Sequence, residues 1–122
     1  MRRDHRLRRK ADIDLVYREG RVVTHPLLVV RTRPNGLERF RFTAVVGKRV
    51  GNAVTRNRVR RRLREIVRQV PVAAGVDLIV GARAGAEQAS FADLAAALGG
   101  LLRRAKALGG VPADRQMATF PS

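Results

Sequence analysis

Residues 48–65 read KRVGNAVTRNRVRRRLRE, and they carry more structural information than any other stretch of the chain. Apolar residues recur in and after this stretch at the spacing of one helix face, and Pro71 stops the pattern. Either Asn52 or Thr55 can cap the first turn. The pattern predicts a helix over residues 53–70 whose buried stripe consists of Val59, Leu63, Ile66, Val67 and Val70.

The opposite side of this predicted helix is almost purely basic. Residues 48–68 contain nine basic residues and one acidic residue. A solvated helix face usually mixes charge signs, because like charges one turn apart destabilise the helix. The planar guanidinium fork of arginine suits phosphates and bases, and the free amides at a helix N-terminus also favour an anion. The pattern therefore indicates a surface for a polyanion, made of Asn57, Arg61, Arg64 and Arg68.

The charge of the whole chain supports the same conclusion. Its 122 residues are enough for one domain, and its formal net charge is +16. Residues 1–70 hold 21 of the 26 basic residues but only 6 of the 10 acidic ones. Nucleic acid is therefore the leading partner, and an anionic membrane surface is the weaker candidate.

The residue types exclude several other classes of site. Without cysteine, the chain has no disulfide, no thiolate metal site and no cysteine nucleophile. His5 and His25 lack metal-ligand spacing, and no carboxylate cluster fits a two-metal site. No apolar run approaches the roughly 20 residues of a membrane-spanning helix, and the N-terminus lacks the apolar stretch of a secretory signal. We expect a cytoplasmic protein with no catalytic residues, cofactor or metal of its own.

The N-terminal region predicts an arm and a short helix. Residues 1–10 hold six basic residues and little to bury, so we interpret them as a mobile basic arm. Ile13, Val16 and Tyr17 then follow helical spacing, and Gly20 lies where a helix C-cap is expected. A helix over residues 11–19 is too short to be stable alone and must pack on the rest of the domain.

Two runs between this helix and the arginine-rich stretch have the character of strands. The first covers residues 27–33, behind Pro26, which marks a strand start or an edge. The second covers residues 40–47, where Phe40 and Phe42 alternate with arginines, as in a strand with one covered face. The turn signal at residues 34–36 lies between the two runs, and we expect them to pair as a hairpin.

The remaining chain predicts one strand, one helix and a loose end. Residues 76–82 read as a buried strand, and residues 91–108 as a long apolar helix capped by Ser90. Two adjacent glycines at positions 99 and 100 allow a kink in that helix. We expect one domain over residues 11–108, followed by a flexible tail at 109–122.

Fifteen consecutive residues, Gly47 to Arg61, resemble the bacterial ribonuclease P protein family. The family pattern there is a small residue, two basic residues, an apolar residue, Gly-Asn-Ala-Val, any residue, Arg-Asn-Arg, an apolar residue and basic residues. The flanking elements also match, so the resemblance covers about residues 6–108. Ile13 and Arg31 depart from the family, which commonly has Phe at the first position and an aromatic at the second.

The resemblance implies the fold and the function. The fold is a single-domain α/β sandwich of the α+β type, with element order αβββαβα and a left-handed βαβ crossover. The protein would be the subunit of an endoribonuclease that matures the 5′ end of precursor tRNA, with hydrolysis performed by the catalytic RNA and its Mg²⁺. The protein would bind that RNA and the single-stranded 5′ leader, without a membrane or an obligatory protein partner.

The resemblance also assigns residues to two surfaces. It assigns contact with the catalytic RNA to Lys48, Arg49, Asn52, Arg56, Asn57, Arg58, Arg61, Arg62, Arg64 and Arg68. It assigns the cleft for the 5′ leader to Ile13, Tyr17, Val29 and Arg31. Plain core packing is an alternative role for both Ile13 and Tyr17.

Three other functions fit parts of the sequence. A structural RNA-binding protein of the ribosomal type shares the small size and the charge, but the motif at 47–61 favours ribonuclease P. A helix-turn-helix DNA binder would need a short helix directly before the arginine-rich one, where strands are predicted instead. A membrane-surface helix would need Trp or Phe on its apolar face, and this one has neither.

Overall fold

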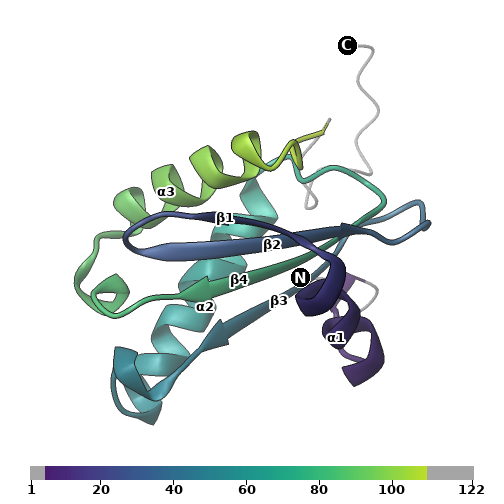
Figure 1. Ribbon diagram of the computed structural model, residues 1–122. Helices are drawn as coiled ribbons and strands as arrows, with labels where there is room; N and C mark the ends of the chain where they lie inside the picture. Colours follow the sequence, from purple (N-terminus) through teal and green to yellow (C-terminus); the bar gives the residue numbers. More distant parts are fainter. Residues whose placement is uncertain (1–4, 110–122) are drawn as a thin grey trace.

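The computed structural model describes residues 5–109, which form three helices and a four-stranded sheet (Figure 1). In chain order the elements are α1 (Lys10–Glu19), β1 (Arg21–Thr24), β2 (Leu28–Pro34), β3 (Arg41–Val46), the 3-10 helix η2 (Lys48–Val50), α2 (Ala53–Gln69), β4 (Val76–Ala82), the 3-10 helix η3 (Ala86–Gln88) and α3 (Phe91–Arg104). The order αβββαβα is confirmed. The short strand β1 was expected only from the family resemblance.

The strand order of the sheet is β1-β2-β4-β3. β4 pairs antiparallel with β2 on one side and parallel with β3 on the other. The expected hairpin between residues 27–33 and 40–47 is therefore wrong, because β4 separates the two strands. Four consecutive residues of β4, from Asp77 to Val80, are buried, as is typical of a central strand covered on both faces.

The connection between β2 and β3 holds the start of β4 instead of forming a tight hairpin. The Asn35 N–H donates to the Gly75 carbonyl at 2.8 Å, and the Gly75 N–H donates to the Arg39 carbonyl at 3.1 Å. Gly75 has a φ of 81°, which favours glycine. These bonds align residues 35–39 with the residue before β4, and β4 then enters between the two earlier strands.

The crossover from β3 through α2 to β4 is left-handed. In Figure 1, β3 and β4 both point to the left, β4 lies above β3, and α2 passes behind the sheet. Parallel strands joined in this way are right-handed in about 98% of cases, so this hand distinguishes the fold.

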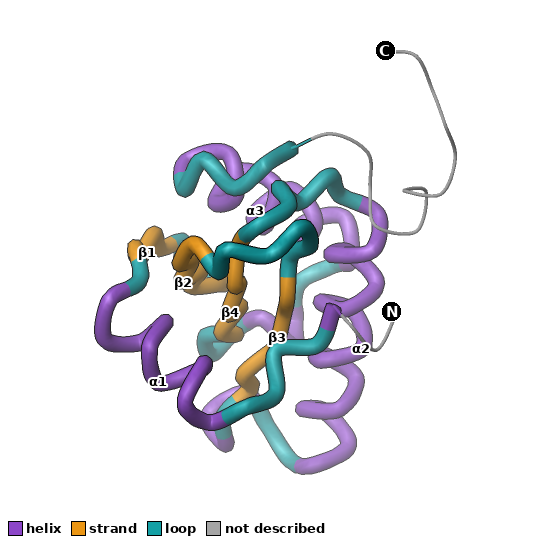
Figure 2. Tube along the Cα trace, turned by 90° about the vertical axis from the view of Figure 1, so that its right-hand side faces the viewer, coloured by secondary structure: helices purple, strands orange, loops and turns teal. Residues whose placement is uncertain are grey.

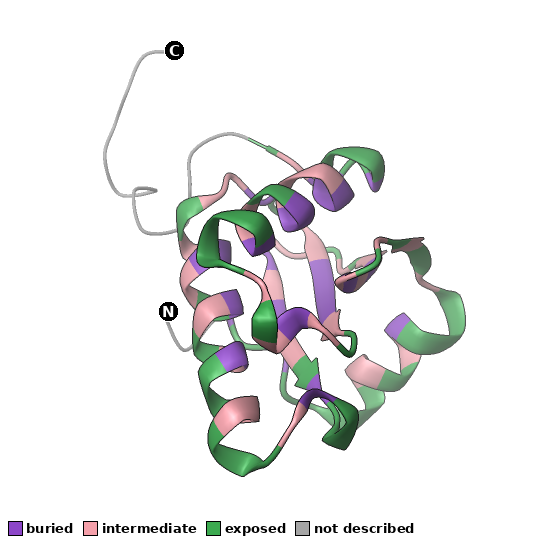
Figure 3. Cartoon of the chain, turned by 90° about the vertical axis from the view of Figure 1, so that its left-hand side faces the viewer, coloured by how far each residue is buried: buried purple, intermediate pink, exposed green. Residues whose placement is uncertain are grey.

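The helices cover the two faces of the sheet unequally, as Figure 2 shows. α2 and α3 pack on one face over the main core, which includes Leu28, Val30, Phe42, Leu78 and Val80. In Figure 3 the buried positions of both helices lie along the sides that face the sheet. α1 covers only part of the other face, over a small cluster of Leu7, Val16 and Ile79 with Ile13.

Residues 5–7, expected to belong to a mobile arm, are packed against β3 and the Phe40 that precedes it. The His5 ring stacks on Phe40 with a centroid separation of 4.2 Å, and its Nδ1 hydrogen-bonds to the Phe40 carbonyl at 2.8 Å. The Leu7 N–H donates to the Phe42 carbonyl at 2.8 Å, and the Leu7 side chain is buried. The partner residues lie some 35 positions later, so local composition gave no sign of this docking. Residues 1–4 of the expected arm lie outside the described residues.

The C-terminal helix is shorter than expected and unbroken at its glycines. α3 continues through Gly99 and Gly100 and ends at Arg104, four residues before the predicted end. The following residues leave the helix to contact the segment after α2, where Ala73 donates to the Ala107 carbonyl at 2.7 Å and Val72 bridges to Leu108. Most of the expected tail, residues 110–122, lies outside the described residues.

Candidate nucleic-acid interface

The loop before α2 presents two basic side chains from a fixed backbone. Val50 is buried and anchors η2, whereas Lys48 and Arg49 are exposed. Gly51 has a φ of 152°, and a Cβ there would lie 2.9 Å from Thr55 Cγ2, so the turn requires glycine. The Asn52 side chain accepts a hydrogen bond from the Thr55 N–H at 2.9 Å, which identifies Asn52 as the N-cap.

The burial of α2 confirms the predicted division into two faces. Val59, Leu63, Ile66 and Val67 are buried against the core. On the opposite side Asn57, Arg61 and Arg64 are exposed, and Arg68 is half-buried. Glu65 is the single acid of the helix, and Arg68 and Gln69 bond to it at 2.9 and 3.1 Å. The face therefore keeps a large excess of positive charge.

The arginines assigned to RNA contact differ in what already holds them. Arg58 donates to the Glu87 carbonyl at 3.5 Å and Arg62 to the Ala89 carbonyl at 3.3 Å, so both tie α2 to the η3 loop. By contrast, Arg61 and Arg64 make no hydrogen bond or ion pair within residues 5–109. Arg56 has a buried Nε without a partner in the same part of the chain. Arg61 and Arg64 are therefore both exposed and free to take a ligand, whereas Arg58 is exposed but already held.

A second surface lies on the face of the sheet that carries α1. Tyr17 is 44% exposed, and the Arg31 guanidinium lies over its ring, 4.9 Å from the centroid. Val29 and Arg31 lie two residues apart on β2 and share this face, whereas Ile13 packs under α1 with Val16. The exposure of Tyr17 rules out the core-packing alternative for its ring, while Ile13 is partly buried against the cluster of Leu7, Val16 and Ile79.

Sequence reasoning missed the floor of this second surface. Gly81 and Val45 share a row with Val29, because β4 pairs with β2 and β3 in that register. A Cβ at Gly81 would lie 2.8 Å from Val29 Cγ1, so glycine keeps the floor low. The strand alternation in residues 41–46 could have indicated Val45, but Gly81 needed the sheet order.

A buried ion pair links α1 to the sheet. Arg41 donates to both carboxylate oxygens of Asp77, at 2.8 and 2.7 Å, and to Asp12 of α1 at 3.2 Å. Asp77 is only 2% exposed and also accepts from Asn35 at 2.9 Å. The hydrogen bond with Asp77 raises the pKa of Arg41 above the usual arginine value, so this guanidinium stays charged.

Other kinds of site have little support in residues 5–109. No group of three His, Asp or Glu side chains there could hold a metal ion. None of the helices in this range has the length and apolar character needed to cross a bilayer. The described surface is thus an arginine-rich face on one side of the sheet and an aromatic–arginine pair on the other.

Comparison with known proteins identifies the family. The family model described as Ribonuclease P matches residues 1–106. The chain belongs to the ribonuclease P protein family. Two curated relatives, both ribonuclease P protein components, are 39% identical in Herpetosiphon aurantiacus, over 87% of this chain and 88% of that one, and 34% identical in Streptococcus pneumoniae, over 77% and 78%.

Solved ribonuclease P proteins share the fold as well. The protein from Staphylococcus aureus has a TM-score of 0.77 at 32% identity, covering 86% of this chain and 98% of that one. The protein from Thermotoga maritima has a TM-score of 0.75 at 31% identity, with the same coverage. Membership in the ribonuclease P family makes the chain the protein subunit of an enzyme of tRNA processing, and implies partnership with the RNA subunit.

Proposed function

We propose that the chain binds the catalytic RNA of ribonuclease P through α2 and its preceding loop, and the 5′ leader of precursor tRNA through the face under α1. The observation that carries this proposal is the presence of two chemically different RNA-competent surfaces on opposite faces of one sheet. One surface offers guanidiniums for phosphates, and the other offers an exposed ring for an unpaired base.

The α2 surface suits a structured RNA backbone. Its exposed arginines can each neutralise a phosphate, and the capped N-terminus of α2 directs the remaining free amides and the helix dipole toward the same region. We assign the contact to Lys48, Arg49, Asn52, Arg56, Asn57, Arg58, Arg61, Arg62, Arg64 and Arg68. Within that set, Arg58 and Arg62 also fix the η3 loop.

The face under α1 suits a single strand. Tyr17 presents its ring, Arg31 packs on that ring, and Val29 continues the surface along β2. Stacking of a base on an aromatic side chain tolerates any sequence, as a leader of varying sequence requires. Ile13 supports the surface from beneath, because it packs with the residues that hold α1 on the sheet.

The chemistry of cleavage belongs to the RNA subunit in this proposal. The sequence offers no paired acid and base, so we assign hydrolysis and the Mg²⁺ it uses to the RNA, and positioning of the substrate to the protein. We place this activity in the cytoplasm, with the catalytic RNA and precursor tRNA as partners and no obligatory protein partner.

Reconstitution tests the proposal. The chain is added to a bacterial ribonuclease P RNA, and cleavage of precursor tRNA is measured at low Mg²⁺. We expect cleavage at the mature 5′ end only when protein and RNA are both present, and none with protein alone. Cleavage by the protein alone, or no stimulation of the RNA, would contradict the proposal. Copurification with ribosomal RNA would instead favour a structural protein of the ribosomal type.

A further inference from the structure

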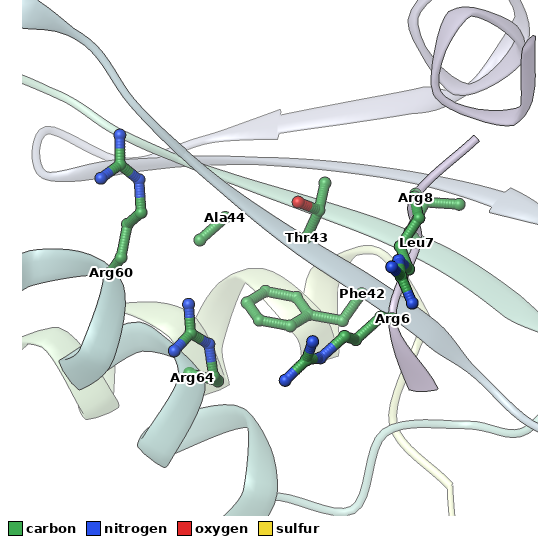
Figure 4. Close-up of a pocket in the computed structure, with 8 residues that line it drawn as sticks. All are labelled: Arg6, Leu7, Arg8, Phe42, Thr43, Ala44, Arg60 and Arg64. Atoms are coloured by element: carbon green, nitrogen blue, oxygen red, sulfur yellow. The ribbon is translucent and has the colours of Figure 1, made fainter. Parts of the chain in front are cut away.

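A pocket of about 330 Å³ lies at the outer edge of β3, between the N-terminal segment and α2 (Figure 4). The pocket lies beside the α2 surface described above and shares only Arg64 with it. Four of its residues are arginines from two distant parts of the chain. The lining consists of Arg6, Leu7, Arg8, Phe42, Thr43, Ala44, Arg60 and Arg64.

The N-terminal side of the pocket has a fixed backbone. Stacking of His5 on Phe40 and the hydrogen bond from Leu7 to Phe42 hold the segment along β3. Arg6 and Arg8 flank the buried Leu7, and both are exposed. Two arginines that the sequence placed in a mobile arm therefore stand at set positions opposite α2.

Within residues 5–109, no acidic side chain balances the charges in the pocket. No acidic residue lines it, and Arg6, Arg8 and Arg64 make no hydrogen bond or ion pair within residues 5–109. Arg60 is already held, by Asn57 Oδ1 at 2.6 Å and the Val46 carbonyl at 3.5 Å. In Figure 4 the Arg6 side chain extends past the Phe42 ring toward Arg64, so the two guanidiniums approach one space. Like charges in that arrangement repel unless an anion lies between them.

The outer edge of β3 adds one backbone donor to the same space. The Phe42 and Val46 carbonyls both face outward, since they accept from Leu7 and Arg60. Peptide groups alternate in direction along a strand, so the Ala44 peptide between them also faces the pocket. Its N–H supplies a neutral donor beside the guanidiniums.

We propose that this pocket binds a backbone phosphodiester of RNA between Arg6 and Arg64. A backbone phosphodiester offers two oxygens that share its negative charge and can accept from two guanidinium forks, and the RNA partner that the family implies carries many such groups. The pocket, at about 330 Å³, holds far more than one water molecule, whose share of liquid volume is roughly 30 Å³. The site extends the α2 surface across the edge of the sheet onto the N-terminal segment. The inference rests on the proposed function, because it names a further contact with the same kind of ligand.

A double-mutant cycle tests whether one phosphate joins the two arginines. Arg6→Ala and Arg64→Ala are each expected to weaken RNA binding. Because both act on one phosphate, the loss in the double variant should differ from the product of the single losses by at least about threefold. Arg49 does not line the pocket, so the losses of affinity from Arg6→Ala and Arg49→Ala should simply multiply in the variant that carries both. Unchanged binding in Arg6→Ala, or a simple product for Arg6 with Arg64, would overturn the shared site.

Three RNA ligands identify the source of the phosphate. Weaker binding of catalytic RNA alone would assign it to that RNA. A loss confined to precursor tRNA bound by the holoenzyme would assign it to the leader, and an equal loss for precursor and mature tRNA would assign it to the tRNA body. Melting temperatures are measured for each variant, and Arg6→Lys, which keeps the charge, replaces Arg6→Ala if folding suffers.

The α2 surface provides the control for the proposed function itself. If Arg61→Ala weakens RNA binding and Arg6→Ala does not, only the pocket is wrong. If neither variant changes the binding of any of the three RNAs, both the pocket and the proposed function are wrong. Arg103→Ala removes an exposed charge from α3 and should leave every affinity unchanged.

Discussion

At the scale of single residues, Tyr17 under α1 and Arg61 on α2 are expected to contact different parts of the ribonuclease P complex. The sequence predicted the apolar stripe of α2 and limited its N-cap to Asn52 or Thr55, of which the structure identifies Asn52, because both features follow from spacing within one helix. It did not predict the burial of His5, which depends on a stack with Phe40. Local patterns carry the first kind of information, whereas the second needs the fold.

Tyr17→Ala tests the surface under α1. If the ring stacks on a leader base, its loss should weaken precursor tRNA binding by the holoenzyme by about 1–3 kcal/mol and leave mature tRNA unaffected. Stability should change little, because Tyr17 is 44% exposed. Paired affinities for the two tRNAs are measured, with Tyr17→Phe as the control that keeps the ring. Equal weakening for both tRNAs would remove Tyr17 from the leader contact.

Arg61→Ala tests the exposed face of α2. If Arg61 neutralises one phosphate, the substitution should reduce the slope of log affinity against log salt by roughly 0.7–0.9, as measured with the catalytic RNA. The free energy of unfolding should stay within about 0.5 kcal/mol of the wild-type value, because Arg61 has no intramolecular partner in residues 5–109. A large fall in melting temperature with normal RNA binding would place Arg61 in the core instead.

At the scale of elements, α1 depends on a few specific contacts. Its apolar support is small, and Arg41 joins it to the buried Asp77 through Asp12. The sequence located α1 to within one residue, yet could not pair Arg41 with Asp77, since the partners come from strands predicted as separate elements. The helix boundary is a local property, but its attachment is not.

Arg41→Met and Asp12→Asn separate the two halves of this ion pair. Removing Arg41 leaves Asp77 buried without its cation and should cost about 3–5 kcal/mol of unfolding free energy. Asp12 is partly exposed, so its loss should cost about 1 kcal/mol or less. Urea denaturation measures both, with Glu19→Gln as an exposed control. Equal costs for Arg41→Met and Asp12→Asn would contradict the importance of the buried pair.

The direction of the Arg41 pKa shift determines how this contact depends on pH. Its pKa is raised, so the stability it contributes is complete below the usual arginine pKa and is lost only as pH rises through the higher value. Titration of Arg41 therefore leaves the contact intact at neutral and mildly alkaline pH.

At the scale of the whole molecule, the sheet order was the main thing the residue patterns did not predict. Turn signals between residues 27–33 and 40–47 suggested a hairpin, and only long-range pairing with β4 overrides that preference. The family resemblance supplied the element order and the hand of the crossover. Residue patterns supplied every α-helix and strand except β1.

Truncation tests the importance of β4. A chain that ends at residue 75 keeps both earlier strands but lacks the strand that joins them, so we expect it to lose cooperative thermal unfolding and near-UV circular dichroism. A chain that ends at residue 109 keeps every residue of the observed core and should retain both. A cooperative transition in the shorter chain would show that β2 and β3 can pair without β4.

The central position of β4 also governs the order in which the sheet can form during synthesis. The ribosome makes this strand after β1, β2, β3 and the arginine-rich helix, yet all pairing between the β1–β2 unit and β3 runs through it. A nascent chain that has emerged only to residue 69 carries its strongest positive charge without a closed core beneath it. The rigid arrangement that presents Arg61 and Tyr17 on opposite faces of one sheet therefore requires β4, although both residues precede it in the chain.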